Sequence, residues 1–407
     1  MVLALEGLKI LDISQVAAVP LTARYLADFG ADVIHIEHPV RGDSFRVFQA
    51  GIAQGTAGVK SKINYNWENY NRNKRSLTVD LSKDEGQKII YRLTKTADVV
   101  LTNLRMFERE KFRLEYRVLS KINPKLIYGS LTGYGKNGPD RDLPAYDATS
   151  YRARSGIMHM LSGWDGKPGG FRPAFGDNAA GMSLFAGVMT ALFIRERTGI
   201  GQEVDISLFF TGVSQISFDV AGALVTGRDY SEWRGRKIDD VPNVLDMAYK
   251  TKDERWGYLV CLQPDNYYAK VCRAIGRDDL INDPRFSSFE PRIKNNVALY
   301  NILVEAFSKK TLAEWKKLMV GIPFAPAQNL LEVINDPQAQ TNDFFVTYDH
   351  PIYGKMRGVD NPIKMSKTPS AVRLPAPEFS QHTEEILLQY GYTWEEITQF
   401  KERGVVA

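Results

Sequence analysis

Cysteine and histidine are scarce in this chain of 407 residues, which contains two cysteines and five histidines. Cys261 and Cys272 do not form a CxxC pair, which argues against a disulfide framework and against a cysteine-based zinc site. Strand alternation puts His35 and Glu37 on the same face, but His38 begins a loop before Pro39, and no HExxH motif is present. We therefore expect reduced thiols and no bound metal.

Several catalytic and nucleotide-binding signatures are also missing. The sequence has neither a GxSxG nucleophile elbow nor a P-loop GxxxxGK[ST], which removes support for a serine hydrolase or an NTPase. The stretch GYGKNG at 133–138 matches a dinucleotide-binding pattern, but Pro139 follows it at once. The first strand–helix turn, residues 14–19, contains no glycine at all. We interpret 133–138 as a turn.

The chain lacks a dominant charge and a long apolar run. Lys and Arg total 52 against 48 Asp and Glu, a balance that suits an anionic small ligand better than nucleic acid. The most apolar run, 179–194, is shorter than a bilayer span and contains two glycines, so we expect a buried helix and no membrane partner. Residues 1–13 lack the apolar core of a signal peptide, which predicts a cytoplasmic protein.

What the sequence does contain is an alternation of short apolar strands with amphipathic helices. Residues 8–13 and 32–37 are predicted strands on either side of a helix that begins near Pro20 and ends at Gly30. This order favours an α/β fold with a doubly wound, parallel, Rossmann-like sheet, which binds ligands at the carboxyl ends of its strands. Further strands are predicted at 76–80, 98–102 and 126–130, and helices at 84–95 and 114–122. Residues 203–207 are predicted to be a strand or the start of a helix. A long loop is predicted at 42–70 and a long connection at 351–377.

One acidic residue stands at the start of the most apolar predicted helix. Asp177 and Asn178 fit the N-cap, where such side chains accept hydrogen bonds from free N–H groups. A second interpretation is that the helix end keeps Asp177 ionised, as a carboxylate nucleophile requires. Gly176 would let another backbone approach closely. The residues alone leave both interpretations open.

Around Asp177 the chain resembles the family III CoA-transferases, a group that contains formyl-CoA transferase, carnitine CoA-transferase and the α-methylacyl-CoA racemases. The resemblance runs almost from end to end and favours the nucleophile interpretation. It rests on LEGLKILD (5–12), LADFGADVIHIE (26–37), NKRSLTVDL (73–81), ADVV (97–100), NPKLI (123–127), GYGKNGP (133–139), GDN (176–178), RTGIGQEVD (197–205), DPRF (283–286), GIPFAP (321–326) and QHTEEIL (381–387).

The resemblance implies both architecture and chemistry. It implies a large Rossmann-like domain from residues 1–225 and 331–407, a small α+β domain from 226–330, and a homodimer of interlocked rings. An acyl-CoA and a carboxylic acid are the implied substrates, with no permanently bound cofactor. Asp177 would attack the thioester to give a mixed anhydride, and CoA would then re-add to give an aspartyl-CoA thioester.

Four residues are implied contacts of the CoA phosphates, namely Arg41, Asn103, Arg105 and Lys111. The family usually has Pro-Gly after the arginine at 105 and a second arginine where this chain has Lys111, and lysine lacks the planar fork of arginine. The alternative is that these are solvated surface charges. The glycine-rich lid of formyl-CoA transferase has no clear counterpart at 227–241, so another segment would have to close the site.

The stretch PAYD at 144–147 separates the activities of the family. Racemases carry Gly-His-Asp there, and this chain has Tyr146 in place of the histidine. Tyrosine is a poor base at neutral pH, so we expect a transferase, with a racemase as the alternative. A non-catalytic CoA-binding protein is a third possibility, which the intact Gly176-Asp177 opposes. Residues 144–156 are most similar to members that act on 2-hydroxy or aryl-substituted acids, where Asp147 would line the acyl pocket, polarise a substrate hydroxyl or make a structural hydrogen bond.

Overall fold

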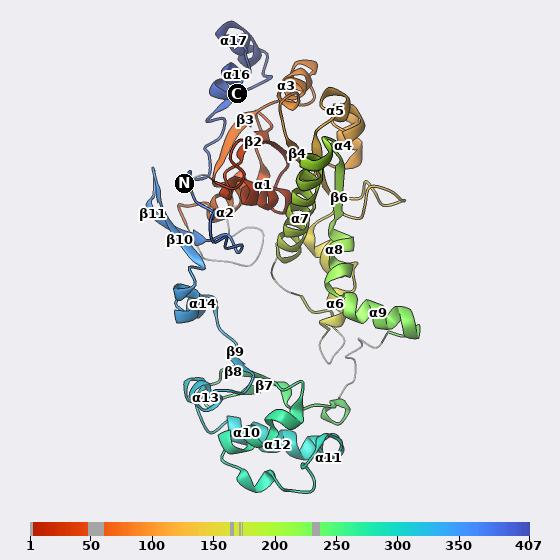
Figure 1. Ribbon diagram of the computed structural model, residues 1–407, viewed down its shortest axis with the longest axis vertical. Helices are drawn as coiled ribbons and strands as arrows, with labels where there is room; N and C mark the ends of the chain where they lie inside the picture. The colour runs from red at the N-terminus through yellow and green to blue at the C-terminus, as the bar shows by residue number, and fades with distance from the viewer. Residues whose placement is uncertain (1–2, 48–60, 163–166, 171, 173, 230–236) are drawn as a thin grey trace. The chain divides into compact units, whose positions relative to one another are not determined.

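The computed structural model describes residues 3–47, 61–162, 167–170, 172, 174–229 and 237–407 (Figure 1). These residues form two compact units. The first contains the described residues up to 161, then 168–229 and 343–407, and the second contains 237–342 with Ser162 and Lys167. The predicted boundary at 330/331 is therefore wrong, since 331–342 belong to the second unit. One contact that joins residues 331–342 to that unit is made by Arg255, which donates to both carboxylate oxygens of Glu332 at 2.7 Å.

A six-stranded, entirely parallel sheet forms the centre of the first unit, which confirms the predicted α/β fold. The strand order β3-β2-β1-β4-β5-β6 means that the chain first builds outward from β1 and then returns to build in the other direction from β4. Residues 203–207, for which the sequence allowed a strand or the start of a helix, form a strand. The strands are β1 (Lys9–Ile13), β2 (Asp32–Glu37), β3 (Lys74–Thr78), β4 (Val99–Thr102), β5 (Ile127–Thr132) and β6 (Glu203–Ser207).

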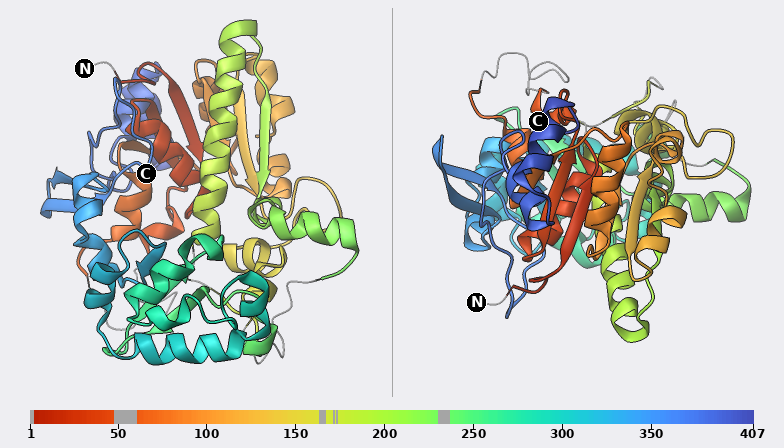
Figure 2. Two further views of the ribbon diagram at one scale, coloured as in Figure 1. Left: turned by 60° about the horizontal axis from the view of Figure 1, so that its bottom comes forward. Right: turned by 90° about the horizontal axis from the view of Figure 1, so that it is seen from above.

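Both faces of this sheet are covered, which explains why its strands are apolar on both sides. One face packs against α1 (Ala18–Asp28) and α7 (Phe175–Thr198) through Ile10, Val33 and Val99. Figure 2 shows α7 running along the sheet. The opposite face packs through Leu11, Ile34 and Val100 against α3 (Asp84–Thr94), α5 (Tyr116–Ile122), α16 (Thr383–Gln389) and α17 (Trp394–Glu402).

Helix α7 has the length and composition of a membrane span, and part of its surface is buried in the core of the first unit. Ala180, Leu184 and Val188 are buried against the sheet. Gly181 lies so close to α1 that an added Cβ would be 2.5 Å from the carbonyl oxygen of Ala18. The Thr22 hydroxyl of α1 donates to the Gly181 carbonyl at 2.8 Å. This contact fixes the start of α1 against the first half of α7.

Two regions predicted as loops contain regular structure. The segment 42–70 includes the 3-10 helix η1 (Ser44–Arg46) and most of α2 (Tyr65–Asn71), although residues 48–60 lie outside the described part. The predicted connection 351–377 contains β11 (Gly354–Val359), which pairs with β10 (Phe345–His350) as an antiparallel hairpin. Remaining elements of this unit are α4 (Met106–Phe112), the π-helix η2 (Asp147–Ala153), α6 (Ile157–Met160), α8 (Leu208–Gln215) and α9 (Ser217–Thr226).

The second unit has its own antiparallel sheet and its own core. The rings of Tyr249 and Trp315 lie 4.8 and 4.7 Å from that of Phe307, and Cys261 and Cys272 are buried nearby as free thiols. Its strands are β7 (Asp246–Lys250), β8 (Trp256–Val260) and β9 (Phe324–Pro326), and its helices are η3 (Ile238–Asp240), α10 (Pro264–Ala274), η4 (Asp278–Leu280), α11 (Phe289–Lys294), α12 (Asn296–Phe307), α13 (Leu312–Leu318), α14 (Leu330–Ile334) and α15 (Pro337–Thr341).

Candidate active site

A cavity of about 380 Å³ lies at the carboxyl ends of β1, β4 and β5. Residues 15–18, 103–105 and 131–133 line it from the ends of these three strands. The other lining residues are Glu108, Arg141, 143–147, Asp177 and Leu208. The strand order reverses between β1 and β4, so the cavity is at the topological switch point of the sheet. Open α/β sheets bind their ligands at this point because the loops on either side diverge there. This cavity, which we call the switch-point cavity, is the candidate active site.

Asp177 is the third residue of α7 and lines the cavity, where it is half-buried. The N-cap is Ala174, whose backbone is left-handed with φ of 67°, so the interpretation of Asp177 as the helix cap is wrong. Burial, followed by the negative charge of Asp147, raises the pKa of Asp177 to about 7, while Arg152 acts in the opposite direction. Burial and the charge of Asp147 therefore act against the helix end, which was expected to keep Asp177 ionised.

Asp147 is the buried carboxylate beside Asp177. It is 4% exposed, and its Oδ1 lies 3.5 Å from Nε of Arg152. The backbone N–H groups of Ala174, Phe175 and Gly176 face its carboxylate and lower its pKa, but burial is the larger effect and leaves that pKa raised. Within the described part of the chain, neither oxygen makes a hydrogen bond of full geometry. The carboxylate that interacts with the N–H groups at the start of α7 is therefore that of Asp147, not that of Asp177.

Gly176 allows these groups to come together. A Cβ at this position would lie 2.7 Å from Oδ1 of Asp147 and 2.2 Å from the ring of Tyr151. The close approach expected at Gly176 is therefore made by side chains, not by another backbone. Any larger residue would push η2 away from the start of α7 and separate Asp147 from Asp177.

The predicted CoA contacts divide into two groups. Asn103 and Arg105 line the cavity, whereas Arg41 and Lys111 do not. Arg105 is the N-cap residue of α4, with its Nε 3.4 Å from Glu108 and its guanidinium 4.5 Å from the ring centre of Phe107. Its side chain is 44% exposed, so it can reach a ligand at the rim. Arg41 and Lys111 are exposed, in the turn after β2 and on α4 respectively.

Asn103, which lines the cavity, also connects two of its loops. Its amide accepts from the backbone N–H of Gln15 at 3.0 Å and donates to the Gln15 carbonyl at 2.8 Å. This pair of bonds joins the loop after β4 to the loop after β1, so Asn103 shapes the cavity by bracing its wall. Tyr146, by contrast, lines the cavity with a side chain that is 68% exposed.

Arg109 is a residue of this region that the sequence did not single out. It is 1% exposed, and its guanidinium donates to the carbonyls of Leu104 at 2.6 Å and Leu131 at 3.1 Å. Both carbonyls belong to residues that line the cavity, so Arg109 ties the ends of β4 and β5 together beneath it. Arg109 differs from the neighbouring charged residues of α4 in being buried. The sequence pattern does not indicate which charged residue of this helix is buried.

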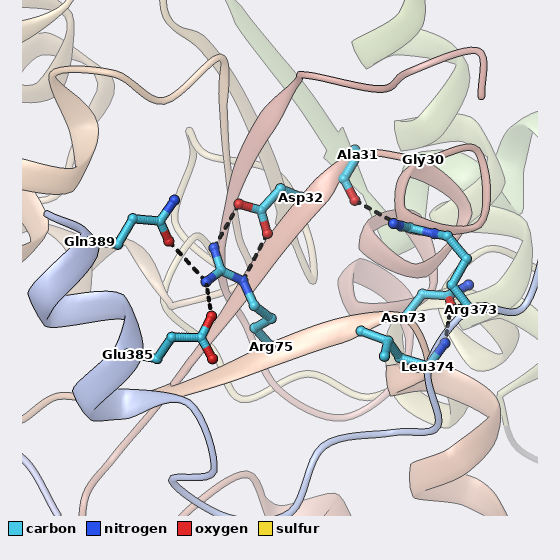
Figure 3. Close-up of a pocket in the computed structure, with 9 residues that line it drawn as sticks. All are labelled: Gly30, Ala31, Asp32, Asn73, Arg75, Arg373, Leu374, Glu385 and Gln389. Carbon is cyan, nitrogen blue, oxygen red and sulfur yellow. Dashed lines mark hydrogen bonds and ion pairs between the residues drawn. The ribbon is translucent and has the colours of Figure 1, made fainter. Parts of the chain in front are cut away.

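A second cavity, of about 540 Å³, lies at the opposite, amino-terminal edge of the same sheet (Figure 3). Arg75 of β3 donates to both carboxylate oxygens of Asp32 at 2.9 and 2.6 Å, and to Glu385 and Gln389 of α16 at 3.0 and 2.9 Å. Arg373 donates to the carbonyls of Ala27 and Ala31. The described residues contain no group of His, Cys, Asp and Glu side chains that could hold a metal ion in either place.

Comparison with known proteins identifies the class. Residues 5–383 match the family described as CoA-transferase family III, and the chain belongs to this family, as its resemblance predicted. It is accordingly an enzyme that transfers CoA between carboxylic acids and takes acyl-CoA thioesters as substrates.

Several known proteins are similar to this chain over nearly its whole length. The chain is 33% identical to (R)-2-hydroxy-4-methylpentanoate CoA-transferase of Clostridioides difficile over 99% of both chains. It is 31% identical to cinnamoyl-CoA:phenyllactate CoA-transferase of Clostridium sporogenes over 98% of this chain and 96% of the relative. A CAIB/BAIF family protein from Brucella suis has a similar crystal structure, with a TM-score of 0.81 and 29% identity over 96% of this chain and 100% of that one. The predicted similarity to 2-hydroxy-acid and aryl-acid members is confirmed.

Proposed function

We propose that this enzyme transfers CoA through covalent intermediates on Asp177. The observation that carries the proposal is the position of this carboxyl group in the switch-point cavity, with its pKa raised to about 7. A carboxylate with a raised pKa holds its electron pair less tightly solvated than an ordinary surface carboxylate, and is the better nucleophile once ionised. Near neutral pH a large fraction of Asp177 is in that ionised state.

The steps balance without a net proton transfer. An oxygen of ionised Asp177 attacks the thioester carbonyl, the C–S bond breaks, and CoA leaves as a thiolate. The thiolate then attacks the Asp177 carbonyl of the mixed anhydride and releases the first carboxylate, which leaves an aspartyl-CoA thioester. The incoming carboxylate repeats both steps in reverse order and restores Asp177. A single carboxylate at the reaction centre suffices for this sequence, so the exposed Tyr146 needs no role as a base.

We further propose that the acid bound beside Asp177 carries a 2-hydroxyl or an aryl group. Two named relatives act on acids of these kinds, and Asp147 and Tyr146 line the cavity next to Asp177. Asp147, with its raised pKa, is suited to accept a hydrogen bond from a substrate hydroxyl or, when protonated, to donate one. Tyr146 supplies an exposed aromatic ring against which an aryl or branched side chain can pack.

A homodimer is part of the same proposal. Helix α9 (Ser217–Thr226) has no buried residue, and its apolar side chains Phe218, Leu224 and Val225 are 87, 81 and 87% exposed. An apolar helix surface of this kind is expected to be covered, and a second copy of the chain is the occupant that the family resemblance implies. Light scattering coupled to size-exclusion chromatography measures the mass directly, and a monomer at micromolar concentration would contradict the dimer.

The reaction type is tested in heavy water. The enzyme is incubated with a panel of acyl-CoA thioesters and a pool of carboxylic acids, and the CoA esters are analysed by mass spectrometry. New thioesters without deuterium at the α-carbon establish the transferase and name the acceptor. Deuterium at the α-carbon without a new thioester would instead mean that the chain is a racemase.

The covalent intermediate is tested separately with hydroxylamine. Incubation with an acyl-CoA alone, without an acceptor acid, should leave an activated aspartyl group that hydroxylamine converts into a hydroxamate. Peptide mass spectrometry should locate this hydroxamate at Asp177, and the D177A variant is the matched control. An active enzyme that yields no label at Asp177 would exclude the aspartyl intermediate while leaving CoA transfer itself intact.

A further inference from the structure

Val16 has a strained backbone in the wall of the switch-point cavity. Its φ is 70°, in the left-handed region that β-branched residues avoid because Cβ crowds the following carbonyl. It belongs to residues 15–18, which connect β1 with α1 and line the cavity. Strain of this kind persists only where surrounding contacts hold it, and it is concentrated at functional sites. The contacts that keep Val16 in this conformation therefore indicate the function of the turn at residues 15–18.

Asp43 supplies the contact that holds Val16. Its two carboxylate oxygens accept from the Val16 N–H at 3.1 and 3.2 Å, and one of them accepts from Phe45 N–H at 2.8 Å. Asp43 is 1% exposed and comes from the turn after β2. Because a buried carboxylate must have partners, its position is strongly determined, and it fixes the direction of the Val16 N–H in turn.

Buried charged side chains of the central sheet orient Asp43. His35 of β2 lies between two carboxylates, with Nδ1 2.9 Å from Asp12 and Nε2 3.5 Å from Asp43. Lys74 of β3 also pairs with Asp12 at 2.9 Å, and all these side chains are fully buried. Burial opposes the imidazolium, but Asp12 and Asp43 together raise the pKa of His35 to about 9, so the ring is charged at neutral pH. The chain of charges extends from the centre of the sheet to the wall of the cavity.

The turn at Val16 decides how α1 begins. Helix α1 starts at Ala18, and its N-cap Ala17 has no side-chain cap. Asn103 fixes Gln15 through its backbone N–H and carbonyl, and Asp43 fixes Val16, so two side chains from neighbouring strand ends clamp consecutive residues. We propose that Asp43 is a positioning residue for CoA binding, which holds Val16 in its left-handed conformation and thereby fixes residues 15–18 against the ligand. This inference rests on the proposed function.

A double-mutant cycle between Asp43 and Val16 tests the proposal. Glycine adopts a φ of 70° at no steric cost, so Val16→Gly should remove most of the need for Asp43. The readout is the dissociation constant of free CoA, measured by calorimetry without turnover. We expect Asp43→Asn to weaken binding by about tenfold in the natural background, the effect of one lost charge-assisted hydrogen bond, and by much less in the Val16→Gly background.

The control is another buried carboxylate that does not touch the cavity. Asp28, at the far end of α1, is 1% exposed and pairs with Arg24 and Arg72. Asp28→Asn should lower the melting temperature and leave CoA binding unchanged. If Asp43→Asn does not fold, His35→Gln, which disturbs Asp43 without removing it, replaces it in the same cycle with the same interpretation.

Two outcomes would overturn the proposal. Equal losses of CoA affinity in the natural background and in the Val16→Gly background would mean that Asp43 only supports the fold, and an unchanged affinity would mean that it does not position the loop. Both outcomes differ from failure of the proposed function, which would appear as natural enzyme that binds no CoA or as D177A that still transfers it.

Discussion

The two cavities at opposite edges of the six-stranded sheet differ in size and in charge. The cavity at the amino-terminal edge is larger, about 540 Å³ against about 380 Å³, yet its charges are neutralised within it. Arg75 there meets Asp32, Glu385 and Gln389. The switch-point cavity instead places Asp147 beside Asp177, and both carboxyl groups have raised pKa values. Two neighbouring carboxyl groups with raised pKa values, and not cavity volume, mark the reactive end of this sheet.

The difference has a physical reason. Paired charges at the amino-terminal edge stabilise the fold by joining α16 to β2 and β3 through Arg75. Like charges at the carboxyl edge repel each other and cost stability, and that cost is only reasonable where chemistry needs a poised carboxyl group. Removal of charged groups at each end of the sheet in turn tests this difference.

The largest effect is expected from Asp177→Ala. Without the attacking oxygen, transfer should fall on the order of 10³-fold or more, while CoA binding is largely retained. Initial rates of thioester exchange and CoA calorimetry measure the two properties. Asp32→Asn, a carboxylate change at the other edge, is the control and should keep most of the transfer rate. Substantial transfer by D177A would remove the functional distinction between the two cavities.

The pH dependence should follow the coupling between the two carboxyl groups. Since Asp177 must be ionised to attack and its pKa is raised to about 7, kcat/KM should rise with pH through about 7 and then level off. Asp147→Asn removes the neighbouring negative charge, so the pKa of Asp177 falls and the rise should move to lower pH. Profiles of kcat/KM from about pH 5 to about pH 9 for both enzymes test this shift. An unmoved profile would show that Asp147 does not control the ionisation of Asp177.

A smaller effect is expected from Arg105→Gln at the rim of the cavity. Loss of one charge-assisted contact should raise KM for acyl-CoA roughly 3- to 10-fold, with little change for the carboxylic acid. The difference from the natural enzyme should shrink as salt screens the remaining charges. Lys111→Gln, outside the cavity, should have less effect on the same KM. A larger effect of Lys111 than of Arg105 would mean that CoA lies across α4.

The smallest effect on catalysis is expected at the amino-terminal edge. Arg75→Met breaks the contacts with Asp32 and Glu385 and should lower the free energy of unfolding by about 1–2 kcal/mol, since the side chain is largely buried. The transfer rate and KM should not change. Urea unfolding and the exchange assay measure the two quantities side by side. A loss of activity at unchanged stability would assign the larger cavity a part in the reaction.

Some of these features are visible in the sequence and others are not. The strands at 8–13 and 32–37 are predictable because parallel strands are covered on both faces and so appear as short apolar runs. The β10–β11 hairpin escapes prediction because much of it is exposed and polar, and has no such run. The assignment of 331–342 to the second unit involves contacts between distant residues, such as Arg255 with Glu332, which no local pattern reveals.

Some features of the candidate site can likewise be predicted from the sequence, and others cannot. Asp177 is found from the motif around it, and Arg105, Tyr146 and Asp147 follow from their places in family segments. The raised pKa of Asp177 could not be predicted, because it arises from burial and from a neighbour that η2 brings close. The cap assignment failed because the N-cap lies three residues earlier, at Ala174, a residue type that does not mark a helix start.

The path of the chain through the first unit has a consequence for its synthesis. Ile386, Leu387, Ile397 and Val405 lie in the same apolar cluster as Leu77 of β3. All six strands are synthesised before residues 237–342, and the segment 343–407, which contains α16 and α17, is synthesised after both. Until it arrives, the nascent chain carries a sheet with part of one apolar face uncovered, which is a surface that chaperones bind and that promotes aggregation. Slow translation or truncation within residues 343–407 should therefore reduce soluble yield far more than either cavity's chemistry would suggest.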